Sequence, residues 1–212
     1  MHETSRPLTL REFEKIISYC RKKQNKVKNK NLKFVYFRNA CLFSLLWFIG
    51  CRPREAYASL LTDLDLRNNT FFINGDRNKV KKSRTRKIPK KLRNILVEYL
   101  QQKNKLFPNS KYLFPSIKNN CIARRSLQLE FQRILKSLNL LEVNFIDNKN
   151  VPRYSLNLYS FRKGHGTYLY EKTGDPYLVQ KSLDHLNIET TCKFYIRAMP
   201  EIISEKILMV FS

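Results

Sequence analysis

The sequence predicts a mainly α-helical protein with one small antiparallel β-hairpin, which makes it an α+β fold. Apolar residues recur at the three- and four-residue spacing of a helix face through most of the 212 residues. Only residues 70–74 and 84–89 combine strand-forming residues with a polar turn between them. Hydrophobic residues make up 42% of the chain, which is enough to bury a core. No internal repeat or linker interrupts this pattern, so we expect residues 1–212 to form a single domain.

The N-terminal part of the chain predicts three helices and a sharp corner. Thr9 and Glu12 form a capping box that opens the first helix. Residues 21–33 are polar and basic, and we expect them to form a connecting loop. Residues 34–50 are apolar on nearly every side, which is typical of a central helix, and they end on a glycine suited to terminate it. Pro53 then suits the first position of a third helix.

The chain after the hairpin is expected to be helical again. We predict that helices begin at Pro89, span residues 124–139 and 160–172, and follow a cap at Asp175. Residues 140–156 contain turn-forming residues and a proline, and we expect them to be irregular.

The C-terminal end predicts one short element and one amphipathic helix. Residues 188–195 read as a short helix or turn. Pro200 suits the start of a last helix within residues 198–212, and its apolar residues fall on one face.

The charge of the chain indicates its class of partner. Lysine and arginine number 41 against 17 acidic residues, so the formal net charge is +24. Such an excess favours a polyanion or an anionic membrane surface. Basic residues are spread along the whole chain and no apolar run approaches a bilayer-spanning length, which favours nucleic acid over a membrane.

The cysteines indicate the cellular compartment. The five cysteines are odd in number, far apart and without a C-x-x-C pair. This usage is typical of reduced thiols in an intracellular protein, cytoplasmic or associated with the nucleoid, and it offers no zinc site.

Residues suited to the cleavage of a phosphodiester occur near the C-terminus. Arg162 lies one turn into a predicted helix, His185 follows another helix, and Tyr195 follows shortly after. Attack requires a nucleophile, stabilisation of the non-bridging oxygens and a proton for the leaving oxygen. Because no cluster of acids has metal-ligand spacing, arginines must supply the positive charge, and the guanidinium fork binds two phosphate oxygens.

Further candidates lie in the first half of the chain. Arg52 lies at the corner before Pro53, and Glu55 lies one turn further on, where it can brace the guanidinium. The tip of the predicted hairpin is strongly cationic. Its basic residues are Arg77, Lys79, Lys81 and Lys82. Such a tip either protects a sheet edge from pairing or carries a lysine to a phosphate.

Each of these residues also has a simpler interpretation. An arginine at a helix corner is commonly a capping or surface residue. A tyrosine is commonly a half-buried packing residue, and the chain has 11. His165 is interpreted in this way, as a satisfied structural group. Only the ordered combination of the candidates indicates chemistry.

In combination, these motifs resemble the catalytic domain of the tyrosine recombinases, the phage integrase family. The resemblance rests on GCRPREA at residues 50–56, the cationic hairpin, and YSFRKGHGTYLYEKTGDPYLVQKSLDHLNIETTCKFY at residues 159–195. The motifs occur in the family's order from about residue 8 to residue 197. The additional N-terminal DNA-clamping domain of many family members is not evident, because the catalytic pattern begins almost at Met1.

The resemblance implies a role for each candidate residue. Arg52 and Arg162 would clamp the scissile phosphate, His185 would hydrogen-bond it, and Tyr195 would be the nucleophile. The remaining implied roles are the hairpin lysine that protonates the leaving oxygen, Lys79 with Lys81 as the alternative; a phosphate-contacting hydroxyl, Tyr159; a supporting acid, Glu55; and DNA-contacting residues, Arg77, Lys81, Lys82, Arg84 and Lys163.

Three positions depart from the family's usual pattern. Tyr159 stands where a histidine is usual, and Asp184 replaces the glycine of L-G-H. Tyr195 lies one residue further from His185 than is common, with Phe194 at the usual place.

The function implied is site-specific recombination of double-stranded DNA through a 3′-phosphotyrosine, without metal or cofactor. Self-association on DNA, as a dimer or tetramer, is also implied, with residues 198–212 packing on a neighbouring subunit. Two alternatives remain: a catalytically impaired DNA-binding regulator of the same fold, and DNA relaxation like that of type IB topoisomerases.

Overall fold

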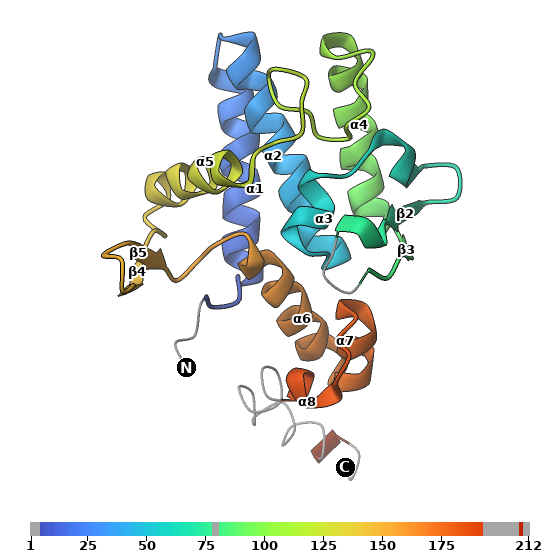
Figure 1. The fold of residues 1–212 in the computed structure, drawn as a ribbon, viewed down its shortest axis with the longest axis vertical. Helices are drawn as coiled ribbons and strands as arrows, with labels where there is room; N and C mark the ends of the chain where they lie inside the picture. The colour runs from blue at the N-terminus through green and yellow to red at the C-terminus, as the bar shows by residue number, and fades with distance from the viewer. Residues whose placement is uncertain (1–4, 78–80, 193–207, 210–212) are drawn as a thin grey trace.

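The computed structural model describes residues 5–77, 81–192 and 208–209, and the fold is mostly helical with two small antiparallel sheets (Figure 1). The helices are α1 (Leu10–Lys26), α2 (Lys30–Ile49), α3 (Pro53–Tyr57), α4 (Lys90–Leu106), α5 (Arg124–Ser137), α6 (Tyr159–Thr173), α7 (Pro176–Leu183) and α8 (Ile188–Thr191). The strands are β1 (Leu64–Asp65), β2 (Thr70–Ile73), β3 (Arg84–Lys87), β4 (Val143–Ile146) and β5 (Pro152–Tyr154). The predicted α+β class is confirmed.

Helix α2 is the centre of the fold. It packs against α1, α4 and α6, and most of its side chains are buried (Figure 1). The expectation that no apolar run approaches a membrane-spanning length is wrong for α2, which alone among the described helices is long and apolar enough to cross a membrane. Its burial is typical of a core helix. The helix ends at Gly50, whose φ of 65° is the left-handed conformation that glycine adopts without strain, as the sequence predicts.

The predicted loop over residues 21–33 is wrong. Helix α1 continues to Lys26 and α2 begins at Lys30, so only three residues connect them. Lysine, arginine and glutamine are good helix formers, and basic side chains in the last turn of α1 interact favourably with its carbonyl end. Asn29 ends the connection by accepting the N–H of Leu32 at 3.1 Å, which caps α2.

The predicted hairpin is confirmed as β2 and β3, with β1 added at the edge of the sheet. The strand order is β1-β2-β3, and Phe71 of β2 lies opposite Leu64 of β1 and Arg86 of β3. Phe71 and Ile73 are buried, which fixes one face of the sheet against the core. The two-residue strand β1 is too short to leave a periodic signal in the sequence.

The predicted irregular segment, residues 140–156, instead contains the hairpin β4–β5. The pairing has a bulge, and Figure 1 shows this hairpin projecting to one side of the fold. The Asp147 carboxylate accepts the backbone N–H of Val151 at 2.9 Å, and Asn150 adopts a positive φ of 56°. These turn residues, which suggested irregular structure, close a tight hairpin between two strands.

Helix α6 packs closely on the core through Gly164. A Cβ at this position would lie 2.6 Å from Trp47 Cζ3 and against the backbone carbonyl of Leu8. The Leu8 N–H in turn donates to the carbonyl of Ser160 at 3.0 Å. The N-terminal segment, α2 and α6 therefore meet where only glycine fits.

Helices α7 and α8 complete the described C-terminal part. Asp175 caps α7 by accepting the N–H groups of Tyr177 and Leu178, as predicted. The last helix predicted from Pro200 lies outside the described residues, apart from Leu208 and Met209, which are helical and exposed.

We predict that Gly164→Ala lowers the free energy of unfolding by about 1–3 kcal/mol, because the added methyl group overpacks a contact that includes backbone. Urea denaturation of both proteins measures the difference. Glu171→Ala, at an exposed position of the same helix, should change stability by less than about 0.5 kcal/mol. Equal stability of Gly164→Ala and the parent protein would contradict the packing argument.

Candidate active site

Arg52 occupies the corner between α2 and α3, where it is the N-cap residue of α3. Its backbone N–H donates to Glu55 Oε2 at 2.7 Å, and its Nη1 donates to Glu55 Oε1 at 3.2 Å. Pro53 follows as the first helical residue, as the sequence predicts. The corner therefore holds the guanidinium beside a carboxylate one turn away.

Glu55 joins α3 to strand β3. It is 1% exposed, and it accepts from Arg84 Nη1 at 3.1 Å and from Arg84 Nη2 at 2.9 Å. Burial raises the pKa of this carboxyl, but hydrogen bonds from Arg84 and from the Arg52 backbone bring the pKa below its ordinary value. Glu55 is thus ionised near neutral pH and lies between two guanidinium groups that would otherwise repel each other.

Arg162 reaches the same region from α6. It is 7% exposed, its Nη1 donates to the carbonyl of Gly50 at 2.8 Å, and its Nη2 donates to the carbonyl of Leu183. Burial, together with the positive charge of Arg52, lowers the pKa of Arg162 to about 10. Arg162 remains a cation at neutral pH. Its contact with the carbonyl of Gly50, two residues before Arg52, brings it to the corner where Arg52 lies.

His185 directly follows the αL residue that ends α7. Its Nδ1 lies 2.9 Å from Thr191 Oγ1 of α8. Burial, followed by the charges of Arg162 and Arg52, lowers the pKa of His185 to about 4. The ring is therefore neutral at pH 7. A Thr191 hydroxyl that donates to Nδ1 leaves the ring proton on Nε2, where it can donate to a phosphate oxygen.

Asp184 ties the end of α7 to strand β3. Its φ is 52°, a left-handed conformation that aspartate tolerates better than most residues. Its carboxylate forms an ion pair with Arg84 and another, at 2.6 Å, with Arg86. Arg86 Nη2 also donates to the carbonyl of Ser182 at 3.0 Å. Where the family usually has glycine, this chain therefore has an additional anchor.

Arg52, Asp184 and His185 line a cavity of about 260 Å³, which we call the cationic pocket, whereas Glu55 and Arg162 are not among its lining residues. Its lining residues are Arg52, Lys82, Arg84, Gln180, Lys181, Asp184, His185 and Leu186. Four of these eight residues carry a positive charge and one carries a negative charge, so the pocket attracts anions. The predicted residues Arg52, Lys82, Arg84 and His185 are thus brought together.

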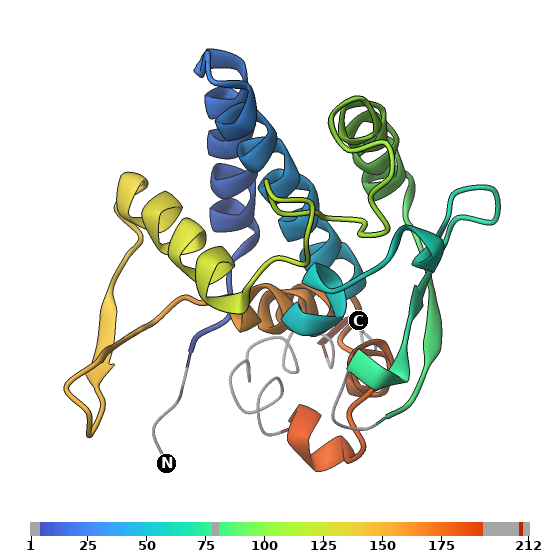
Figure 2. The ribbon, with the colours of Figure 1, turned by 45° about the horizontal axis from the view of Figure 1, so that its top comes forward.

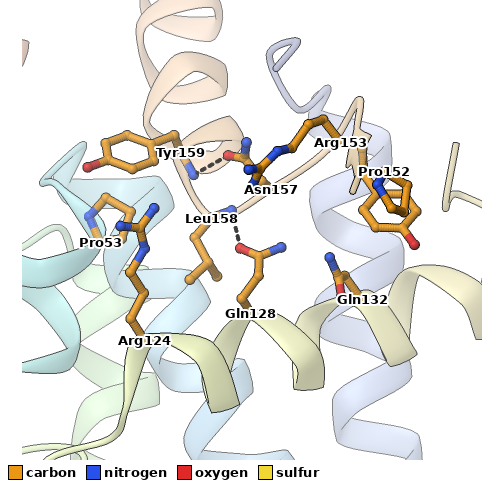
Figure 3. Close-up of a pocket in the computed structure, with 10 residues that line it drawn as sticks. Pro53, Arg124, Gln128, Gln132, Pro152, Arg153, Asn157, Leu158 and Tyr159 are labelled. Carbon is orange, nitrogen blue, oxygen red and sulfur yellow. Dashed lines mark hydrogen bonds between the residues drawn. The ribbon is translucent and has the colours of Figure 1, made fainter. Parts of the chain in front are cut away.

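Tyr159 lies in a second cavity, of about 160 Å³, which we call the polar groove (Figure 3). Its lining residues are Pro53, Arg124, Gln128, Gln132, Pro152, Arg153, Tyr154, Asn157, Leu158 and Tyr159. Tyr159 is 44% exposed, and Figure 3 shows its ring extending over Pro53 and Arg124. Tyr159 is absent from the residues that line the cationic pocket, and its contact with a phosphate stays a prediction.

Other predicted DNA contacts lie elsewhere. Arg77 forms an ion pair with Asp63, and Lys163 Nζ donates to the carbonyl of Ser5. Both side chains therefore hold segments of the fold together. Lys81 is exposed at the hairpin tip, next to the residue that lines the pocket. A role in DNA binding stays a prediction for all three.

Two predicted catalytic residues, Lys79 and Tyr195, lie outside the described residues. Their roles stay predictions that rest on the motifs. Among the described residues, no group of three or more His, Cys, Asp or Glu side chains could hold a metal ion. Independence of metal nevertheless stays a prediction.

His165 has the structural role expected of it. Its Nδ1 lies 2.7 Å from the carbonyl of Trp47 and its Nε2 lies 2.7 Å from Ser182 Oγ. The ring therefore joins α2, α6 and the end of α7. Burial lowers its pKa to about 4, so it is neutral at pH 7.

Sequence reasoning missed Arg86, Gln180 and Thr191 as parts of the site. Arg86 was detectable, because residues two apart on a strand share a face, and Arg84 was already a candidate. Gln180 donates to the carbonyl of His185 at 3.1 Å, a contact that no spacing in the sequence indicates.

Arg52, Arg162 and the neutral His185 come from distant segments and lie near the β2–β3 hairpin, which Glu55 binds through Arg84. This is the arrangement expected of a tyrosine recombinase catalytic domain. A family model described as the phage integrase family matches residues 6–201. The chain therefore belongs to the phage integrase family.

Solved structures show the same fold. XerH site-specific recombinase bound to its difH substrate is similar with a TM-score of 0.69 at 22% identity, over 99% of this chain and 54% of that one. The Tn1549 transposon integrase in complex with right-end DNA has a TM-score of 0.72 at 18% identity, over 97% of this chain and 66% of that one. XerA recombinase has a TM-score of 0.70 at 17% identity, over 97% of this chain and 65% of that one. The chain thus spans about half of the XerH chain.

We predict that stability falls as the pH drops from about 6.5, the ordinary pKa of an unfolded histidine, toward 5. His165 has a folded pKa of about 4, so the unfolded state binds more protons in this range. The stability it contributes is present above pH 6.5 and is lost on acidification. Urea denaturation at pH 7, 6 and 5 measures the slope.

The matched variant is His165→Gln. It removes one titrating group, so the loss of stability per pH unit should diminish by up to about 1.4 kcal/mol. An unchanged slope in this variant would contradict the assignment of a neutral, buried ring.

Proposed function

We propose that the chain cleaves and rejoins double-stranded DNA at specific sites through a 3′-phosphotyrosine intermediate. The observation that carries the proposal is that Arg52 and the neutral His185 line the cationic pocket, while Arg162 is held between the carbonyls of Gly50 and Leu183, each two residues from one of them. Guanidinium groups stabilise the charge that develops on the non-bridging oxygens, which is the electrostatic requirement of phosphoryl transfer.

The reaction uses residues from both halves of the chain. The Tyr195 hydroxyl loses its proton to solvent and its oxygen attacks the phosphorus, the bond to the 5′ oxygen breaks, and Lys79 or Lys81 protonates that oxygen as it leaves. Arg52 and Arg162 bind the non-bridging oxygens, and His185 donates a hydrogen bond to one of them. Rejoining is the reverse, with a 5′-hydroxyl as the nucleophile. The covalent bond conserves the energy needed to reseal the strand.

DNA is the partner that the net charge of +24 favours. Similar structures include XerH bound to difH substrate and a lambda integrase dimer bound to a core site. By analogy, we infer that this chain acts on duplex DNA inside the cell and self-associates there, with residues 198–212 contacting a neighbouring subunit.

A DNA-binding regulator without catalysis is the second candidate. Asp184 favours it, because its carboxylate neutralises Arg84 and Arg86 beside the pocket where a phosphate would bind. Relaxation of supercoiled DNA of any sequence would instead favour an activity like that of type IB topoisomerases.

We predict that a pool of nicked duplexes of random sequence traps a covalent protein–DNA adduct. The nick lets the short 5′-hydroxyl fragment diffuse away after cleavage, so rejoining fails. Denaturing gel electrophoresis measures the adduct. Tyr195→Phe should abolish it, and Phe194→Tyr should not restore it in that background. DNA binding without any adduct would favour the regulator.

We predict that Arg52→Lys reduces the rate of adduct formation by roughly 100-fold or more, because the ammonium loses the bidentate fork. DNA affinity should change little, since many other cations contact the backbone. Arg54→Lys is the matched control, because Arg54 is exposed and does not line the cationic pocket. Equal effects of the two variants, or equal losses of binding and cleavage in Arg52→Lys, would contradict the assigned role.

A further inference from the structure

Helix α6 bridges the two segments that carry Arg52 and His185. The C-terminal end of α2 leads into Arg52, and the C-terminal end of α7 leads into His185. Figure 2 shows α6 passing close to the end of α2 and then to α7, and α6 packs against both helices. Arg52 and His185 both line the cationic pocket. Their separation therefore depends on how α6 holds these two helix ends.

Two side chains of α6 make parallel bridges between the helix ends. Arg162 makes the first bridge, because it donates from Nη1 to the carbonyl of Gly50 and from Nη2 to the carbonyl of Leu183. His165 lies three residues further along α6, and residues three apart lie on the same helix face. The second bridge thus runs beside the first.

The ring of His165 makes the second bridge, and one tautomer fits it. Its Nδ1 lies 2.7 Å from the carbonyl of Trp47, and its Nε2 lies 2.7 Å from Ser182 Oγ. A carbonyl only accepts, so Nδ1 carries the proton and Nε2 accepts from the Ser182 hydroxyl. The Trp47 carbonyl is one of the last four of α2, which have no partner within the helix. A Cβ at Gly50 would lie 2.5 Å from Cδ2 of this ring, so the ring also packs on the corner before Arg52.

The turn that follows Ser182 carries His185 as part of one unit. The N–H of His185 donates to the carbonyl of Gln180 at 3.1 Å. Gln180 Nε2 donates in return to the carbonyl of His185, also at 3.1 Å. These two bonds close the turn, so a displacement of Ser182 also displaces His185.

His165 differs in charge from the side chains that hold this turn beside it. Arg86 donates to the carbonyl of Ser182, and Arg162 donates to that of Leu183. Both are cations that a bound phosphate also attracts, and a guanidinium that turns to a phosphate weakens its bond to a carbonyl. The neutral ring of His165 is not subject to this competition. Its hold on the turn therefore persists when DNA is bound.

We propose that His165 is a positioning residue, which holds His185 at a fixed distance from Arg52. It acts through the carbonyl of Trp47 at one helix end and the hydroxyl of Ser182 at the other, and it does not contact the phosphate. The effect on cleavage rests on the proposed function. The effect on the His185 ring does not, because it is measured without cleavage.

The first test removes one contact of the bridge. Ser182→Ala lets the turn shift relative to Arg52, so the rate of adduct formation on a saturating pool of nicked duplexes should fall roughly 10- to 100-fold. DNA affinity should change by less than about twofold, because many other cations still contact the backbone. Ser182→Thr keeps the hydroxyl and should restore the rate.

The second test follows the His185 ring itself. The chain has three histidines, so NMR of protein labelled at histidine resolves each ring, and His185→Gln identifies the signal. Burial and the charges of Arg162 and Arg52 lower the pKa of His185 to about 4. In Ser182→Ala this pKa should rise by about one unit or more, because the ring moves toward solvent and away from these charges.

A double-mutant cycle and a control variant isolate the contact. The amide of His165→Asn reaches the position of Nδ1 but not that of Nε2, so this variant loses Ser182 alone. Combined with Ser182→Ala, it should cost no more than either change by itself. Tyr99→Phe loses a buried hydrogen bond elsewhere, to the carbonyl of Leu113 at 3.0 Å, and should leave the adduct rate and the pKa of His185 unchanged.

Three results would overturn the proposal: an unchanged rate and pKa in Ser182→Ala, fully additive losses in the cycle, or an equal loss in Tyr99→Phe. Absence of adducts from the parent protein refutes strand cleavage alone. The titration of His185 then decides the positioning role, because a raised pKa in Ser182→Ala supports it and an unchanged pKa refutes it.

Discussion

The buried carboxylate of Glu55 is the interaction on which the candidate site depends. It binds the guanidinium of Arg52, the residue before α3, and that of Arg84 from β3, and it is only 1% exposed. Removing one partner of such a buried pair leaves an uncompensated charge, at a typical cost of about 3–5 kcal/mol. Glu55 therefore couples the position of Arg52 to that of strand β3 in the hairpin.

Asp184 extends this arrangement to α7. Positive and negative groups alternate from Arg52 through Glu55, Arg84 and Asp184 to Arg86, so each of these three arginines has an anion beside it. A chain with a net charge of +24 needs such pairing wherever its cations approach one another.

Much of the fold followed from local patterns. The capping box at Thr9, the terminal Gly50 and the Pro53 corner each have a local physical cause, and the structure has each where the sequence indicated it. The failures also have causes. Residues 21–33 were assigned to a loop because of their charge, although lysine and arginine favour helices. The hairpin β4–β5 was missed because its strands are short and mostly exposed, which leaves no alternation of apolar and polar residues.

The sequence by itself determined the residue types, their order and the helices that carry them, because capping, periodicity and turn chemistry act over a few neighbouring positions. Only the tertiary structure decided that Arg162 contacts the carbonyl of Gly50 near Arg52, that His185 is neutral, and that Tyr159 belongs to the polar groove. These properties depend on burial and on charges brought together from distant segments. Neither can be read from spacing along the chain, because both arise only when the core has formed.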